Sequence, residues 1–217
     1  MERNYRFNTD LYCITAEELS MGRSNIEVVK EMIAAGVKII QYREKDKKMK
    51  AKYQECSVIR ELTKEAGVTF IVNDDIDLAM IVQADGVHIG QDDLPIEKVR
   101  ELVGDQMIIG ISTHCPEEAQ QAVKDGADYI GVGPIFKTAT KKDVCDPVGF
   151  DYLEYVAKNI PIPFVAIGGI KLNNLSEVVK RGTPCIAVIT EITTAQDMPE
   201  RINEIRDMIK KSRVEEK

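Results

Sequence analysis

Eight short runs rich in β-branched and other apolar residues alternate along this chain with longer stretches of helical periodicity. Such alternation is typical of βα units assembled around a parallel sheet. The expected strands are Leu11–Thr15, Val37–Tyr42, Val68–Asn73, Gly86–Ile89, Ile108–Ser112, Tyr129–Gly133, Phe164–Ile167 and Ile186–Thr190. The expected helices are Asn25–Ala35, Met49–Ala66, Asp75–Val82, Ile96–Val103, Pro116–Lys124, Phe150–Asn159, Leu172–Arg181 and Pro199–Lys211.

The number of units favours a closed barrel over an open sheet. A doubly wound open sheet usually needs fewer strands, whereas eight βα units in 217 residues match the smaller (β/α)8 (TIM) barrels. Neither a change in composition nor a Gly/Ser-rich linker divides the chain. We therefore predict one α/β domain, a (β/α)8 barrel over residues 1–217, with an open sheet as the alternative.

Composition narrows the kinds of molecule that the protein is expected to bind. The chain is 44% hydrophobic and 30% charged, which fits a globular domain, and its net charge of −7 disfavours nucleic acid. Its apolar runs are shorter than the roughly 20 residues that cross a bilayer. The five cysteines are scattered, without zinc-ligand spacing. We expect a soluble, cytoplasmic protein without nucleic-acid or membrane partners; homo-oligomerisation is left open.

Polar and glycine-rich segments follow most of the expected strands. In (β/α)8 barrels the chemistry lies at the carboxyl ends of the strands. The segments in question are Gln41–Lys45, Asn73–Asp75, His88–Asp93, Ser112–His114, Thr138–Lys141, Gly168–Ile170 and Ile189–Thr190. The turns that lead into the strands are short caps by comparison. This asymmetry predicts an active site on one face of the barrel.

Two carboxylates predict a metal site. Asp74 and Asp93 end neighbouring strands, so their side chains can converge on one cation. Mg²⁺ prefers hard oxygen ligands and is commonly held by one or two carboxylates together with substrate phosphates. The alternative is that Asp75 and either Asp92 or Asp93 cap the helices that follow, since aspartate is a favoured N-cap residue.

Three cations and a glycine pair predict phosphate binding. Arg43 and Lys45 leave one strand two residues apart and so share a side, while Lys141 follows another strand. Together with Mg²⁺ they can neutralise a pyrophosphate, although each lysine can also be an ordinary surface residue. Gly168–Gly169 and Ile189–Thr190 indicate a second, smaller phosphate site of the kind that barrels often carry there; the glycines can equally serve a tight turn.

The two histidines do not suggest nucleophilic catalysis. His88 is expected to be a hydrogen-bonded packing residue, and His114, although near the pocket, is not assigned as a base. No spacing in the sequence supports a Ser-His-Asp or Cys-His arrangement.

Several motifs taken together are similar to those of the thiamine-phosphate synthase family, over nearly the whole chain. They are QYREK, IVNDD, DGVHIGQDD, GIST, GADYIGVGPIF followed by TATKK, and AIGGI. The resemblance implies a (β/α)8 transferase, a thiamine-phosphate diphosphorylase. Such an enzyme joins 4-amino-2-methyl-5-hydroxymethylpyrimidine diphosphate to a thiazole phosphate, often carboxylated, releases pyrophosphate and requires Mg²⁺.

The same resemblance assigns roles residue by residue. It implies that the pyrimidine diphosphate is bound by Gln41, Arg43, Lys45, Asn73, Ser112 and Lys141. It implies that Asp74 and Asp93 bind Mg²⁺. It implies that the thiazole phosphate is bound by Thr138, Thr140, Gly169, Ile189 and Thr190. Tyr42, Glu44 and Ala139 lie inside these motifs and are counted as substrate-binding candidates. The catalytic set is Arg43, Lys45, Ser112 and Lys141.

One position departs from the family pattern. Thr190 stands where serine is common, and it keeps both a hydroxyl and a backbone N–H. The family is thought to react through a pyrimidine cation formed when pyrophosphate leaves, so a covalent nucleophile is unnecessary. The cation must be kept from water, and the loop over residues 136–148 is a candidate cover.

Three other functions are left open. A thiazole tautomerase of the same barrel family would bind thiazole phosphate without the diphosphate cations. A sugar-phosphate epimerase would use only the smaller phosphate site. A non-catalytic protein would sense a thiamine precursor. Product formation from the two substrates, with and without Mg²⁺, separates all of them.

Overall fold

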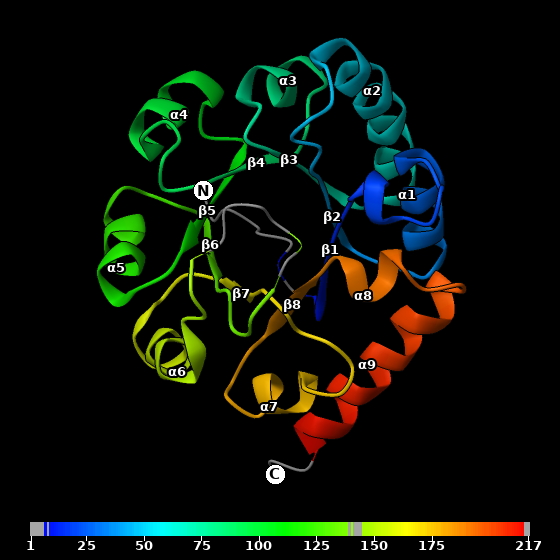
Figure 1. The fold of residues 1–217 in the computed structure, drawn as a ribbon. Helices are drawn as coiled ribbons and strands as arrows, with labels where there is room; N and C mark the ends of the chain where they lie inside the picture. The colour runs from blue at the N-terminus through cyan, green and yellow to red at the C-terminus, as the bar shows by residue number, and fades with distance from the viewer. Residues whose placement is uncertain (1–6, 8, 139, 141–144, 215–217) are drawn as a thin grey trace.

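The protein is a closed (β/α)8 barrel. The computed structural model describes residues 7, 9–138, 140 and 145–214. Over these residues eight parallel strands pair in chain order, and β8 closes on β1 (Figure 1). The strands are β1 (Leu11–Ile14), β2 (Ile39–Tyr42), β3 (Thr69–Asn73), β4 (Gly86–Ile89), β5 (Ile108–Thr113), β6 (Tyr129–Val132), β7 (Phe164–Ala166) and β8 (Cys185–Val188). The predicted barrel is confirmed, and the open-sheet alternative is wrong.

Helices form a ring around the strands (Figure 1). They are α1 (Asn25–Ala34), α2 (Met49–Ala66), α3 (Ile76–Ile81), α4 (Ile96–Val103), α5 (Pro116–Lys124), α6 (Gly149–Asn159), α7 (Leu175–Val179), α8 (Thr190–Thr193) and α9 (Met198–Val214), with a short 3-10 helix η1 (Glu17–Leu19). Local signals mark several ends. Ser24 and Glu27 form a capping box at α1, and Gly67 ends α2 with φ 63°.

Strand alternation builds two cores. In β2, Ile40 and Tyr42 pack outward among the strands and helices, whereas Ile39 lies in a smaller inner cluster. That inner cluster fills the barrel with Tyr12, Ile14, Ile39, Ile71, Tyr129, Val165, Cys185 and Ala187. Because the inside is packed, ligands are confined to the ends of the barrel.

Several boundaries differ from the sequence expectations by one to three residues, and three differences lie in the segments that follow the strands. Strand β8 ends at Val188, and Thr190 is the first residue of the unpredicted helix α8. Helix α7 begins only at Leu175, because Asn174 holds the preceding loop: its Oδ1 accepts from the Lys171 N–H at 2.7 Å and its Nδ2 donates to the Gly169 carbonyl at 3.0 Å. Helix η1 is too short to leave a periodic signal.

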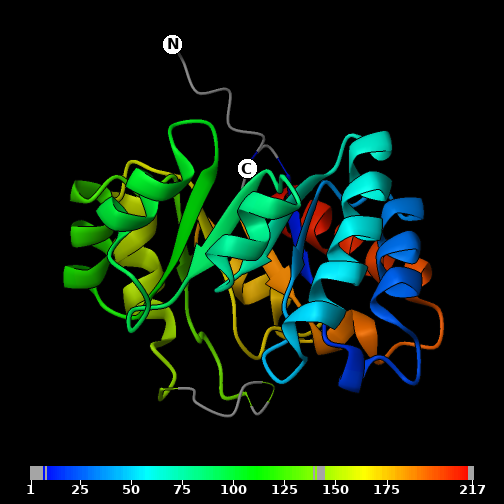
Figure 2. The ribbon, with the colours of Figure 1, turned by 90° about the horizontal axis from the view of Figure 1, so that it is seen from above.

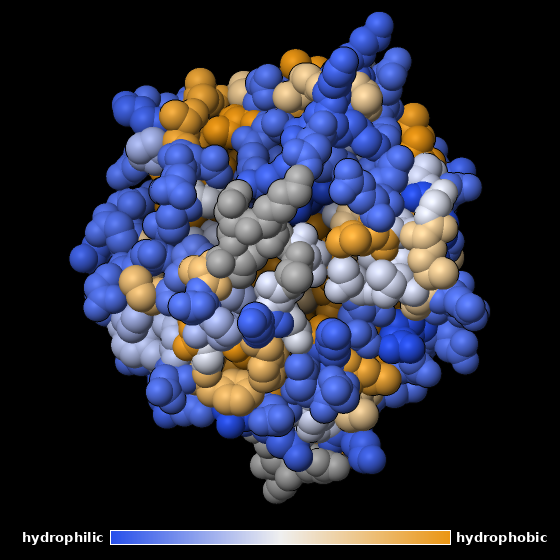
Figure 3. Space-filling view, in the orientation of Figure 1, coloured by the Kyte–Doolittle hydropathy of each residue, from blue (hydrophilic) through white to orange (hydrophobic). Residues whose placement is uncertain are grey.

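The two ends of the barrel differ in character. At the amino ends of the strands, Asp85 and Asp128 pair with Arg60 and Arg100 from the surrounding helices, each at 2.8 or 2.7 Å. The loops that follow the strands gather at the opposite end, at the bottom of Figure 2. Figure 3 shows that this face is largely hydrophilic. Among the described residues, no helix is both long and apolar enough to cross a membrane.

Candidate active site

Two adjoining cavities open at the carboxyl ends of the strands. The larger, of about 880 Å³, is lined mainly by residues at or after the ends of β1 to β5, and the smaller, of about 400 Å³, mainly by residues at or after the ends of β5 to β8. Four residues line both cavities: Leu19, Ser112, His114 and Thr140. The segments predicted to carry the chemistry therefore meet on one face, divided into two halves that share a wall.

The larger cavity contains the predicted metal ligands. Asp74 directly follows β3 and adopts φ 61°, a conformation that is uncommon outside glycine. Its N–H donates to the His88 carbonyl at 2.9 Å. Asp93 lies in the loop after β4, where its Oδ2 accepts from the Gly90 N–H at 2.6 Å. Burial raises the pKa of Asp74, Lys45 opposes that rise, and the charge of Asp93 adds to it. The two carboxylates are thus close enough to interact.

The capping alternative does not describe these aspartates. Asp75 stands at the N-cap of α3, but its side chain makes no capping bond and accepts from Lys52 Nζ at 2.7 Å instead. The N-cap of α4 is Pro95, so neither Asp92 nor Asp93 caps that helix. Asp75 therefore joins α2 to the loop beside Asp74, and Asp93 is left with its carboxylate at the cavity.

Arg43 is a half-buried cation with unused hydrogen-bonding capacity. Its Nε is buried and, within the described residues, has no acceptor. Burial lowers the pKa of the guanidinium, while the charges of Asp74, Glu44 and Asp46 raise it. A buried donor without an acceptor is costly, and a phosphate oxygen would satisfy it. Lys45 is 59% exposed, and its Nζ lies 3.5 Å from Asp74 Oδ2.

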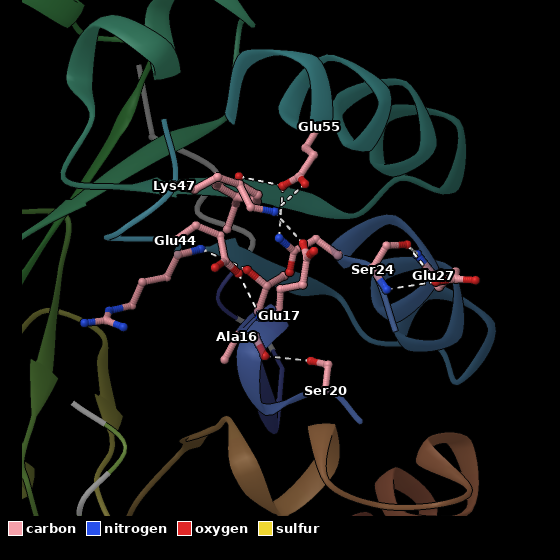
Figure 4. Close-up of polar contacts among 12 residues, drawn as sticks. Ala16, Glu17, Ser20, Ser24, Glu27, Glu44, Lys47 and Glu55 are labelled. Carbon is pink, nitrogen blue, oxygen red and sulfur yellow. Dashed lines mark hydrogen bonds and ion pairs between the residues drawn. The ribbon is translucent and has the colours of Figure 1, made fainter. Parts of the chain in front are cut away.

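A network of polar side chains holds the loop that carries Arg43 (Figure 4). Lys47 pairs with both Glu17 of η1 and Glu55 of α2, and Glu44 accepts from the Glu17 N–H at 3.0 Å. Glu55 also accepts from the Tyr42 hydroxyl at 2.7 Å. The Glu44 and Tyr42 side chains, both counted as substrate-binding candidates, are therefore engaged in the scaffold. Tyr42 faces the helices, because alternation turns it outward from the barrel.

Ser112 stands on the wall between the two cavities. Its Oγ lies 3.0 Å from His88 Nε2, and its carbonyl accepts from Gln91 Nε2 at 2.7 Å. His88 is 9% exposed and hydrogen-bonded through both ring nitrogens, as predicted. Gln41 lies deeper, 3% exposed, and donates to the Tyr12 hydroxyl at 2.9 Å. Asn73 ends β3 and lines the larger cavity.

The smaller cavity is built by close backbone packing. Gly168 and Gly169 have φ of 99° and 64°, and an added Cβ would lie 2.4 Å from Pro134 Cβ and 2.7 Å from the Lys137 carbonyl oxygen, respectively. The tight-turn alternative is thus correct for these glycines, and the turn also brings them to the cavity wall. Thr138 and Thr140 join through their hydroxyls at 3.1 Å, and Ile189 and Thr190 line the opposite wall. Ala139 and Lys141 lie outside the described residues.

Several lining residues were not predicted from the sequence, among them Leu19, Lys137 and Lys171. Leu19 reaches both cavities from η1, and Lys137 and Lys171 line the smaller one. Lys137 precedes the threonine motif and Lys171 follows the glycine pair, so a search for cations beside those motifs would have found them. Leu19 left no such signal.

The fold and the site together define a (β/α)8-barrel enzyme with paired pockets for charged small molecules. A family model described as thiamine monophosphate synthase matches residues 11–192. The chain belongs to this family, whose members are transferases of thiamine biosynthesis.

Individual relatives agree over almost the full length. Thiamine-phosphate synthase of Pelotomaculum thermopropionicum is 64% identical over 92% of both chains, and that of Lawsonia intracellularis is 55% identical over 93% of both. A solved structure of thiamine phosphate pyrophosphorylase from Pyrococcus furiosus superposes with a TM-score of 0.86 at 36% identity, covering 95% of this chain and 98% of that one.

Proposed function

We propose that this protein condenses 4-amino-2-methyl-5-hydroxymethylpyrimidine diphosphate with thiazole phosphate, or its carboxylated form, to give thiamine phosphate and pyrophosphate, with CO2 lost as well when the thiazole is carboxylated. Its relatives are thiamine-phosphate synthases along nearly their whole length. One observation carries the proposal beyond family membership: two cavities with different chemistry share a wall at Ser112. A reaction that joins two substrates needs two such sites side by side.

The larger cavity fits the diphosphate. Arg43 offers a guanidinium whose buried Nε has no acceptor among the described residues, and Lys45 offers an exposed ammonium on a flexible side chain near Asp74. The smaller cavity fits the thiazole phosphate, through Thr138, Thr140 and the turn at Gly169. A tautomerase or an epimerase would need only the smaller cavity.

The residues present also fit Mg²⁺. Asp74 and Asp93 both line the larger cavity, and the charge of Asp93 contributes to the raised pKa of Asp74. The described residues contain no cluster of three or more potential metal-binding side chains. Mg²⁺ commonly takes one or two carboxylates and completes its shell with water and substrate phosphate. Bound there, it would supply charge neutralisation to the departing pyrophosphate.

The protein's own side chains stabilise charge, align the two substrates and limit the access of water. Arg43 and Lys45, with Lys141 as the third predicted cation, stabilise the negative charge that collects on pyrophosphate as its C–O bond breaks. The pyrimidine ring then carries the positive charge, and the walls shared by the two cavities hold the thiazole nitrogen against that carbon. Leu19, 37% exposed at the junction of the cavities, adds apolar surface that limits the access of water.

The test is to mix the purified protein with the two substrates, with and without Mg²⁺, and to measure both products. We expect thiamine phosphate and pyrophosphate in equal amounts, and neither without Mg²⁺. Isomerised thiazole without pyrophosphate would instead indicate a tautomerase, and binding without turnover would indicate a sensor. The cytoplasmic location expected from the sequence stays a prediction.

A further inference from the structure

A line of hydrogen bonds crosses the inside of the barrel from β2 to β5. Gln41 Nε2 donates to the Tyr12 hydroxyl at 2.9 Å, and that hydroxyl lies 2.8 Å from the Tyr129 hydroxyl. The Tyr129 hydroxyl lies 2.8 Å from His88 Nδ1, and His88 Nε2 lies 3.0 Å from Ser112 Oγ. We call these five residues the inner network.

The inner network is tightly enclosed. Tyr12 and Tyr129 are 2% and 1% exposed, and the ring of Phe7 packs on Tyr129 with centroids 4.4 Å apart. The Tyr129 phenol lies over Gly110, where an added Cβ would be only 2.0 Å from the ring. Burial raises the pKa of both phenols, so each keeps its proton at neutral pH. Each phenol hydroxyl therefore carries one proton, and close packing holds it against the same hydrogen-bond partners.

The direction of the network follows from counting protons. A hydroxyl can donate only once, and the Tyr12 oxygen already accepts from Gln41. In the reverse order the Tyr12 oxygen would accept from both Gln41 and Tyr129, and its buried O–H would have no acceptor among the described residues. Tyr12 therefore donates to Tyr129, and Tyr129 to His88 Nδ1. A neutral imidazole that accepts at Nδ1 carries its proton on Nε2, and this proton goes to Ser112 Oγ. The Ser112 proton remains available to a substrate.

We infer that the inner network fixes the Nε2–H tautomer of His88 and so presents Ser112 to the substrate as a hydrogen-bond donor, with Tyr12, Tyr129 and His88 as positioning residues. This deepens the proposed function and rests on it, because Ser112 lines both proposed substrate cavities. A substrate with a lone pair facing Ser112, such as an unprotonated ring nitrogen, is accepted. A substrate with an N–H at that position is disfavoured.

The tautomer can be measured directly in the substrate-free protein. The chain has only two histidines, so ¹⁵N-histidine NMR gives two ring systems, and His114→Gln assigns them. We expect His88 at neutral pH to show a protonated Nε2 and an unprotonated Nδ1. A protonated Nδ1, or a doubly protonated ring, would overturn the inference.

A change at Gln41 tests whether the direction of hydrogen-bond donation at one end of the inner network sets the direction at the other end. Gln41→Glu introduces a carboxylate that, when ionised, can only accept. At a pH high enough to ionise it, Tyr12 would donate to it, and the reversal would pass through Tyr129 to move the His88 proton to Nδ1. A folded variant that retains the Nε2–H tautomer would contradict the inference. If this variant does not fold, Tyr129→Phe serves instead, since it removes the donor to His88 Nδ1 and should give a mixture of both tautomers; an unmixed Nε2–H form would contradict the inference.

Kinetics test the effect on the substrate. Tyr129→Phe is expected to raise KM for the pyrimidine diphosphate about two- to tenfold, the value of one hydrogen bond, with a smaller change in kcat. The matched control is Tyr152→Phe, which removes another buried phenol that donates to Thr113 Oγ1 at 2.7 Å outside the network. It should alter neither KM nor the tautomer. An unchanged KM in Tyr129→Phe would refute the positioning role. Wild-type protein that forms no product would refute the proposed function and leave the tautomer result standing.

Discussion

Single residues in the site are held in states that cost free energy in the absence of a ligand. Asp74 adopts φ 61° without being glycine, and Arg43 has a buried Nε without an acceptor among the described residues. Strained backbone and unsatisfied buried groups persist where the surroundings enforce them, and they cluster at functional sites. The backbone conformation of Asp74 and the Nε of Arg43, unpaired within the described residues, therefore indicate a functional role more strongly than the two residue types do.

Arg43→Lys tests the need for a guanidinium. Lysine keeps the charge but loses the planar fork that matches phosphate oxygens. We expect kcat/KM for the pyrimidine diphosphate to fall by about 10²–10³, the scale of removing one well-placed electrostatic group. Arg60→Lys is the control, because Arg60 pairs with Asp85 at the opposite end of the barrel and should leave kcat/KM unchanged. Equal activity in the two variants would remove Arg43 from the diphosphate site.

Asp74→Asn separates metal binding from stability. Asparagine tolerates positive φ, so the backbone is preserved while the charge is lost. The Mg²⁺ concentration for half-maximal activity should rise at least about tenfold, since even residues behind metal ligands change affinity by that much. Burial raises the pKa of Asp74, so the ionised carboxylate opposes folding at neutral pH, and the Tm without Mg²⁺ should stay equal or increase. An unchanged Mg²⁺ titration would show that Asp74 is not a ligand.

At the scale of elements, the network in Figure 4 joins η1, β2, α1 and α2 behind the cations of the site. The Glu55 carboxylate accepts hydrogen bonds from Lys47 Nζ, from the Tyr42 hydroxyl and, at 3.0 Å, from Asn25 Nδ2. Burial by itself raises the pKa of Glu55, but these three hydrogen bonds outweigh it and hold the pKa below its usual value. The carboxylate is therefore more stable as an anion in the folded protein than in the unfolded chain.

Glu55→Gln should destabilise the protein in a pH-dependent way. A depressed folded-state pKa contributes stability above the unfolded value of about 4.3, and the contribution is lost as pH falls through the folded value. Urea unfolding should show a loss of about 1.5–3 kcal/mol near neutral pH, the scale of a hydrogen bond to a charged group, and a smaller loss in acid. Glu61→Gln, an exposed change on the same helix, should have little effect at either pH. A loss that does not vary with pH would contradict the charge-based explanation.

At the scale of the whole molecule, the barrel separates stability from chemistry along its axis. Asp128, with a 3% exposed side chain before β6, accepts from Arg100 and from the Ile109 N–H at 2.7 and 2.8 Å. The cavities lie at the other ends of the strands. Residues at the amino ends of barrel strands generally serve folding, whereas those at the carboxyl ends serve catalysis.

Asp128→Ala should therefore weaken folding without altering turnover. Removing one partner of a buried pair leaves an uncompensated charge and costs about 3–5 kcal/mol. We expect urea unfolding to show that loss, while kcat/KM per folded molecule stays at the wild-type value. Glu101→Ala is the control: it removes an exposed pair with Lys98 and should cost less than about 1 kcal/mol. A fall in kcat/KM in Asp128→Ala would show that the two ends are coupled.

The amino-acid sequence alone determined the order of the elements and the side of the barrel that carries chemistry. The predicted bounds of α2, α4 and α5 match the structure, because apolar periodicity and end signals such as Gly67 and Pro116 act locally. The position of Asp74 and Asp93 after neighbouring strands also follows from local pattern together with the one-sidedness of barrels.

Only the tertiary structure decided which partner each polar side chain takes. Asp75 binds Lys52 rather than its own helix, and Glu44 accepts from the Glu17 N–H. The Tyr12 and Tyr129 hydroxyls meet across 117 residues of sequence because β1 and β6 face each other inside a closed barrel. Local propensity sets which segments become strands, but a hydrogen bond between distant strands exists only after closure brings them together, and no short-range pattern in the sequence encodes that distance.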